Sequence, residues 1–159
     1  IEGATLSLPR FEGEVTEKTG LMTLPLSQGI TLNSMWGRKG LATFLSQNGA
    51  PQVLSFATLA SKCGIQTKDF FVCAIPRMLP KSTEGLPDDW FQGRISFSDD
   101  LFTVDARTGE QYSLYTFKEE EGAFDIIKLT SSEDNFFVSF TKKQDSSLWL
   151  LNTNLLGEN

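Results

Sequence analysis

The sequence contains no histidine, and this absence excludes several chemistries at once. Ser–His–Asp and Cys–His catalysis, HExxH zinc sites and the usual acid–base group of neutral pH all need that residue. Only two cysteines are present, and without a CxxC pair they cannot form a structural zinc site alone. Glycine-rich phosphate loops of the Walker or Rossmann type are also missing. We therefore expect no metal, no cofactor and no catalytic residue set of these kinds.

Long apolar runs are also scarce. The least polar run covers residues 20–32, yet it carries Pro25, Ser27 and Gln28. A membrane-spanning helix needs roughly 18 apolar residues, so we expect no span in this sequence. The chain opens with Ile1 rather than Met, and we expect a processed product or a cut-out domain, with any targeting segment or anchor upstream.

Basic residues are outnumbered, with 14 Lys and Arg against 20 Asp and Glu and a net charge of -6. An acidic protein repels polyanions, which argues against nucleic acid as a partner. Two of the carboxylates could form a glycosidase pair or a calcium site. However, none of the acidic clusters has EF-hand spacing, and all lie in predicted turns, where acidic residues cap the backbone. The clusters are Asp88–Asp89, Asp99–Asp100, Glu119–Glu121 and Glu133–Asp134.

Phenylalanine is abundant, with thirteen copies, and many of them alternate with polar residues in the second half of the chain. From Trp90 to Asn154, six short segments are apolar at every second position and are separated by turn-forming residues such as Ser98–Asp100. This spacing of about ten residues predicts an antiparallel up-and-down meander, either a curved sheet or a barrel. The six predicted strands are 91–97, 101–105, 111–118, 123–130, 135–141 and 146–152.

The first half is mixed. Gln52–Cys63 has apolar residues at helical spacing and Gly64 just beyond, which predicts a helix, although Val53, Ser55, Ala57 and Leu59 also alternate, as in a strand. Phe70–Ile75 is a continuous apolar run that predicts a strand covered on both faces. Further short strands are predicted at Ala4–Leu8 and within Leu21–Leu32, and Leu41–Ser46 fits either a helix or a strand.

Together these patterns predict an α+β fold that is mostly β, with one or two short helices in the N-terminal half. We expect a single domain over 1–159, with a mixed segment at 1–80 and the meander at 90–154. The pattern over residues 90–154 resembles that of lipocalin-like barrels and half-barrels. The GxW signature of lipocalins is missing, because Trp36 follows Gly29 by seven residues.

Two local features suggest specific sites. Cys63 and Cys73 are ten residues apart, and an even number of cysteines fits a disulfide formed in an oxidising compartment, with two buried thiols as the alternative. Gly37-Arg38-Lys39-Gly40 could bind an anion through backbone N–H groups and two cations. Its GxxG spacing resembles the loop with which K-homology domains hold a nucleotide backbone, while a plain hairpin or helix-entry turn is the alternative.

Several predicted strands are apolar on both faces, so either a helix covers the second face or a partner does. We therefore expect a non-catalytic extracytoplasmic module (secreted, periplasmic or membrane-tethered) that contacts a protein partner. One alternative is the binding of a small apolar ligand in a cavity lined by phenylalanines, and a second is a small carboxylate-based hydrolase. The candidate lining residues are Phe97, Phe117, Phe124 and Phe140.

Overall fold

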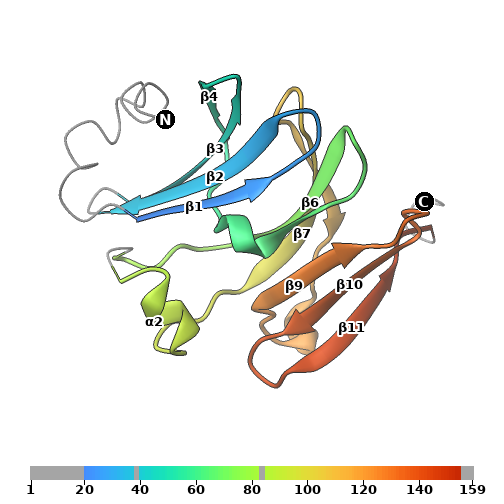
Figure 1. Cartoon of the computed structure of the whole chain (residues 1–159). Helices are drawn as coiled ribbons and strands as arrows, with labels where there is room; N and C mark the ends of the chain where they lie inside the picture. Colours follow the sequence, from blue (N-terminus) through green and yellow to red (C-terminus); the bar gives the residue numbers. More distant parts are fainter. Residues whose placement is uncertain (1–19, 38–39, 83–84, 155–159) are drawn as a thin grey trace.

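A computed structural model describes residues 20–37, 40–82 and 85–154. The described chain is mostly β and forms three antiparallel sheets (Figure 1). In each sheet, every strand pairs only with its neighbours along the sequence. The prediction of a mostly β chain with few helices is therefore confirmed, whereas no closed barrel is found among the described residues.

The first sheet is built from local hairpins. It contains β1 (Gly20–Pro25), β2 (Ile30–Gly37), β3 (Gly40–Gln47) and β4 (Ala50–Val53). Asn48 and Gly49 connect β3 to β4 with φ values of 52° and 78°. Positive φ at both central residues is the requirement of a type I′ turn, whose twist matches that of the strands. Asn-Gly therefore explains why the chain reverses here.

The second sheet lies between the other two. It contains β5 (Cys63–Ile65), β6 (Phe70–Pro76), β7 (Asp99–Asp105) and β8 (Gln111–Tyr115). Phe71 and Cys73 pack in one buried cluster with Leu32 of the first sheet. Val72 and Ala74, which alternate with them, pack in a second cluster with residues of the third sheet. The prediction of a strand over 70–75 that is covered on both faces is thus confirmed.

The third sheet contains β9 (Ile126–Ser131), β10 (Phe137–Lys142) and β11 (Ser147–Asn152). The first strands of the sheets lie near one another: β9 lies against β5, and β1 packs on the 3₁₀ helix η1 (Ala60–Lys62) that directly precedes β5. A Cβ at Gly64 would overlap the carbonyl oxygen of Leu129, so only glycine permits this approach of β5 to β9. The sheets therefore radiate from their first strands (Figure 1).

The predicted helix over Gln52–Cys63 is wrong. Gln52 and Val53 belong to β4, residues 54–59 are irregular, and helical geometry is limited to η1. The backbone of Thr58 accepts a hydrogen bond from the Thr43 hydroxyl and donates one to it, each 2.8 Å long. These contacts to β3 replace the bonds that a helix would have made within itself.

The meander contains five strands rather than six. Residues 91–97 form no strand, because α2 (Asp88–Phe91) ends there in a turn at Gly93, which has a φ of 75°. The remaining strands are divided between two sheets, since β7 and β8 pair with β6 whereas β9–β11 pair among themselves. The short helix η2 (Glu119–Glu121) lies between the two groups. The predicted strand at Ala4–Leu8 lies outside the described residues.

Candidate functional site

The side chain of Lys62 is completely buried between two carboxylates. Its Nζ lies 2.7 Å from Asp99 Oδ2 and 2.6 Å from Asp125 Oδ1. It also donates a 3.0 Å hydrogen bond to the Ile126 carbonyl. Lys62 ends η1, Asp99 begins β7 and Asp125 directly precedes β9, so one ammonium group joins three parts of the fold. We call Lys62, Asp99 and Asp125 the ion cluster.

Asp125 also accepts hydrogen bonds from α2 and from the segment that follows it. Its carboxylate accepts hydrogen bonds from Trp90 Nε1 at 2.9 Å and from the Phe97 backbone N–H at 3.1 Å. The Ser96 hydroxyl donates a further bond of 3.3 Å. These donors hold the segment between β6 and β7 against the start of the third sheet. Every oxygen of this carboxylate therefore has a partner.

Asp99 is less completely paired. Its Oδ2 accepts a 2.8 Å bond from the Ile126 N–H and contacts Lys62, but its Oδ1 is buried and has no hydrogen-bond partner among the described residues. Burial raises the pKa of Asp99 from 3.8 to about 6, against the opposing effect of Lys62. Burial and the lack of a hydrogen bond to one oxygen both disfavour the charged form of this carboxyl group.

A second ion pair lies at the other side of β7. Arg77 donates to both oxygens of Asp100, from Nε at 2.8 Å and from Nη2 at 2.7 Å, and Asp100 accepts the Phe117 N–H at 3.0 Å. The prediction that Asp99 and Asp100 lie in a turn is therefore wrong. Both begin β7 and are buried, because a cation from a distant part of the chain meets each of them.

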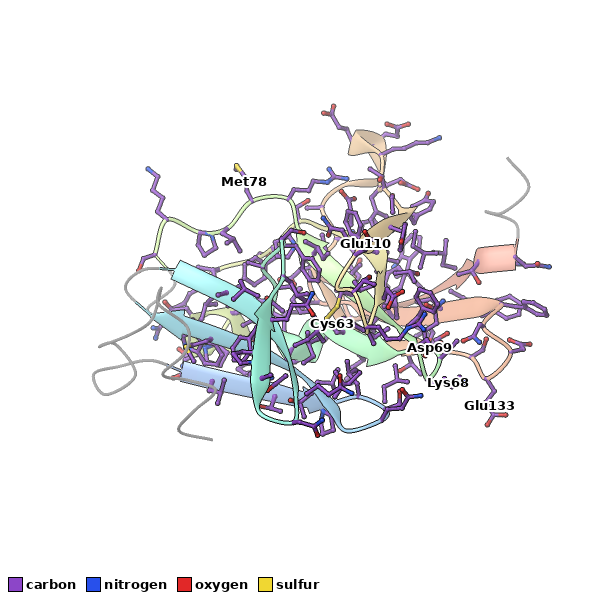
Figure 2. The ribbon with its side chains drawn as sticks, turned by 90° about the horizontal axis from the view of Figure 1, so that it is seen from above. Cys63, Lys68, Asp69, Met78, Glu110 and Glu133 are labelled. Carbon is purple, nitrogen blue, oxygen red and sulfur yellow. A yellow bond between two sulfur atoms is a disulfide. The ribbon has the colours of Figure 1, made fainter. Side chains whose placement is uncertain are left out.

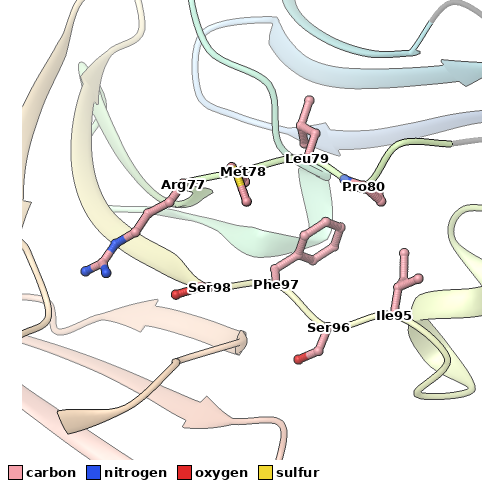
Figure 3. Close-up of a pocket in the computed structure, with 8 residues that line it drawn as sticks. All are labelled: Arg77, Met78, Leu79, Pro80, Ile95, Ser96, Phe97 and Ser98. Carbon is pink, nitrogen blue, oxygen red and sulfur yellow. The ribbon is translucent and has the colours of Figure 1, made fainter. Parts of the chain in front are cut away.

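An open groove of about 590 Å³ lies beside this ion pair. The Arg77 N–H bonds to the Ser98 carbonyl at 2.9 Å, and beyond this point the two segments diverge, with the Phe97 ring between them (Figure 3). The lining is mostly apolar, and Met78 is 82% exposed. The lining residues are Arg77, Met78, Leu79, Pro80, Ile95, Ser96, Phe97 and Ser98.

The outer strand of the third sheet carries exposed apolar side chains. Leu148 and Leu150 are 78% and 66% exposed, and they share one face of β11. Trp149 points to the opposite face, where its ring meets Phe124 edge-on with centroids 4.9 Å apart. No strand of the described chain pairs with the outer edge of β11, and β11 contains no charged residue. We call Leu148, Leu150 and this free edge the β11 surface.

The structure brings together three of the four phenylalanines predicted to bind a ligand. Phe117 and Phe124 stack with ring centroids 4.1 Å apart, and each meets Phe140 edge-on. Phe97 belongs to a different cluster, beside Trp90, and lines the groove. All four are buried. The first three rings thus pack on one another, and their role in ligand binding stays a prediction.

The cysteine prediction is confirmed, because Cys63 and Cys73 form a disulfide between paired positions of β5 and β6. Figure 2 shows Cys63 in the interior, whereas Met78 and Glu133 lie at the periphery. Gly37 and Gly40 face each other across a two-residue hairpin connection, as the alternative of a plain turn predicts. Arg38 and Lys39 lie outside the described residues, so anion binding stays a prediction.

The other acidic clusters lie where turns were predicted or in short helices. Asp88 and Asp89 are in α2, and Glu119–Glu121 form η2. Asp134 accepts the Phe136 N–H and the Ser132 hydroxyl, and these bonds lower its pKa. No group of three or more metal-ligating acids or cysteines occurs within the described ranges.

Sequence reasoning missed the ion cluster. Its members are separated by up to 63 positions and belong to no motif. The available signals were weak: a lysine directly before an apolar cysteine-containing strand, and an aspartate between Phe124 and Ile126. A charge within an apolar stretch is a hint of a buried ion pair, but nothing in the sequence identifies the partner.

Comparison with known proteins adds no family. No protein-family model, no curated protein and no solved structure matches this chain. In the part of the chain that the structure describes, no helix has the length and apolar character needed to cross a bilayer.

Proposed function

We propose that this chain is a non-catalytic module that binds a protein partner through the β11 surface. The observation that carries the proposal is an uncharged strand whose two leucines are mostly exposed at a free sheet edge in the described chain. Isolated exposed leucines are ordinary, but adjacent ones on an unpaired edge combine apolar area with free backbone hydrogen-bonding groups. Partner strands commonly bind such edges by extending the sheet.

The architecture supports a role as a scaffold. Successive antiparallel meanders that radiate from their first strands resemble the blades of β-propellers. The second sheet is covered on both faces, whereas Leu148 and Leu150 of the third sheet are exposed.

The polar chemistry of the interior favours a binding module over an enzyme. Lys62 is completely enclosed and already bonded to Asp99, Asp125 and a carbonyl, so it is not available to a substrate. Asp100 is bonded to Arg77 in a bidentate pair. A carboxylate-based hydrolase would instead need two acids that converge on an open cleft.

The disulfide supports an extracytoplasmic location, because such bonds persist in oxidising compartments and are rare in reducing ones.

Site-directed photo-crosslinking tests the function. A photoreactive residue placed at Leu150 should give adducts with another protein in an extract of the source cells, whereas the same residue at Ile65 should give few. Ile65 is a matched control because it is half-exposed and lies on a different sheet. An identical adduct pattern at both positions, or none at position 150, would overturn the proposal.

A second candidate is an apolar ligand in the groove beside Arg77, which the buried Phe97 ring and the exposed Met78 and Leu79 favour. A panel of fatty acids and bile salts should raise the melting temperature of the protein. Leu79→Ser should remove the shift, and Leu21→Ser, a similarly exposed control on the first sheet, should keep it. Absence of any shift across the panel would eliminate this candidate.

A further inference from the structure

The ion cluster brings a primary amine and a carboxyl group together in an enclosed site. Lys62 Nζ contacts Asp125 Oδ1 at 2.6 Å, and both side chains are buried. The rings of Trp90 and Phe97 lie beside the amine, with centroids 4.9 Å and 5.0 Å from Nζ. This enclosure keeps bulk water away from the two groups. An amine and a carboxyl group held in this way are the reactants of an amide.

We propose that Lys62 and Asp125 form an intramolecular amide (isopeptide) bond, with Asp99 as the proton carrier. The inference goes beyond the proposed function and does not depend on it. The structure holds the two groups as reactants, in hydrogen-bond contact, because an amide C–N bond is only about 1.33 Å long. The bond joins the end of η1 to the residue before β9, across 63 positions of sequence. It therefore ties the first strands of the second and third sheets together covalently.

The hydrogen bonds of the two carboxylates identify the one that reacts. Asp125 Oδ2 accepts the Trp90 Nε1–H at 2.9 Å and the Phe97 backbone N–H at 3.1 Å. Such a pair of donors stabilises the negative charge that develops on a carboxyl oxygen when an amine attacks Cγ. Asp99 Oδ2 accepts one backbone N–H, that of Ile126, and its Oδ1 has no hydrogen-bond partner in the described chain. Asp125 is therefore the carboxyl group that is attacked.

Two protons must leave the lysine nitrogen. The first passes from the Lys62 ammonium to Asp125 Oδ1 along their 2.6 Å contact, which gives a neutral amine and a neutral carboxyl group. The amine attacks Cγ, so that the N–C bond forms and Oδ2 takes the negative charge. Asp99 Oδ2, which is 2.7 Å from Nζ, accepts the second proton and passes it to the Oδ1 hydroxyl. The Cγ–Oδ1 bond then breaks, water leaves, and Asp99 is ionised as it was at the start.

The surroundings favour each part of this reaction. Burial raises the pKa of Asp99 to about 6, and a proton carrier works best when its pKa is near the working pH. Groups that are held in position react as if their concentration were about 10⁵–10⁸ M. The product also carries less buried charge, because the ammonium and one carboxylate become a neutral amide.

The intact mass of the full chain tests the inference. After incubation of the folded protein at neutral pH and reduction of the disulfide, the wild type should be lighter than its sequence by one water molecule. Trypsin does not cleave after an acylated lysine, so digestion should leave the chain intact at Lys62. The expected product is a branched peptide of residues 40–68, which contain Lys62, and residues 119–128, which contain Asp125.

D99N tests the proton carrier, because it keeps both reactants. It should slow the loss of water by about 100-fold or more. D100N is the matched control, since it changes the neighbouring buried carboxylate of β7, which binds Arg77 instead, and it should lose water at the wild-type rate. Cooperative melting of both variants would show that they are folded.

A wild-type chain with the full mass of its sequence overturns the inference. A branched peptide that joins Lys62 to residues 95–107, which contain Asp99, overturns the assignment of Asp125. Equal rates of water loss in D99N and the wild type overturn the role of Asp99. The proposed function is tested separately at Leu150, so either result can fail without the other.

Discussion

Replacement of Asp99 by asparagine tests the role of one carboxylate of the ion cluster independently of the other. The cluster holds one cation and two anions, all of them buried, so it carries an excess negative charge in the interior. Burial raises the pKa of Asp99 to about 6 from an ordinary 3.8. At 1.36 kcal/mol per pH unit, that difference corresponds to about 3 kcal/mol between the two protonation states.

The upward shift of the pKa determines how the stability of the protein changes with pH. A carboxyl group whose pKa is higher in the folded protein binds its proton more tightly there than in the unfolded chain. Its contribution to stability is therefore complete below pH 3.8 and is lost as the pH rises through about 6. We expect the wild-type protein to lose up to about 3 kcal/mol through Asp99 between pH 4 and pH 7.

D99N lacks this titration. Its amide oxygen can still accept the Ile126 N–H, and its NH₂ group would replace Oδ1, which has no hydrogen-bond partner in the described chain. Relative to the wild type, D99N should thus gain about 3 kcal/mol in unfolding free energy as the pH rises from 4 to 7. Urea titrations followed by tryptophan fluorescence at several pH values measure this difference, because Trp90 lies beside the cluster.

D125N is the matched comparison. Asp125 accepts bonds from Lys62, Trp90 and the Phe97 N–H, so an amide NH₂ group there must face a donor. We expect D125N to cost about 3–5 kcal/mol at pH 7, as when one partner of a buried ion pair is removed. A difference between D99N and the wild type that does not change with pH, or equal losses in both variants, would refute the reasoning.

Three further changes have expected costs. Replacing Cys63 and Cys73 by alanine should lower the unfolding free energy by about 2–3 kcal/mol through the lost loop constraint, and a reductant should lower the melting temperature of the wild type alone. Gly64→Ala should cost about 2 kcal/mol or more in urea titrations, because its Cβ would overlap the carbonyl of Leu129. Trp90→Phe should lower the unfolding free energy by about 1–3 kcal/mol beyond any loss of packing, because the buried Asp125 carboxylate loses a hydrogen-bond donor. Phe91→Leu, which changes an exposed neighbour, is the control in the same titration.

Much of the fold could be predicted from local patterns. Phe70–Ile75 identifies a strand covered on both sides because nothing polar interrupts it. The cysteines were correctly paired from their number and spacing. These signals are local, and they do not depend on which sheet a strand joins.

The errors arose where distant contacts decide the structure. Residues 91–97 alternate as a strand does, but Trp90 and the Phe97 N–H bind a carboxylate 28 to 35 positions away, and this holds the segment as a turn. The segment over 52–63 lacks helix because β3 supplies its hydrogen bonds. Asp99 and Asp100 resembled turn residues because their partners, Lys62 and Arg77, are 37 and 23 positions earlier.

The two-faced strands also explain why the sheets radiate instead of closing into a barrel. A small barrel has one apolar interior, so its strands alternate between an inner and an outer face. β6 is apolar on both faces, and its side chains are all buried only when a sheet lies on each side. The first and third sheets cover the two faces of the second sheet in this way. β11 has the same two-faced pattern, but only its inner face, with Trp149 against Phe124, is packed. Leu148 and Leu150 on its other face are exposed, and the proposed protein partner would cover them.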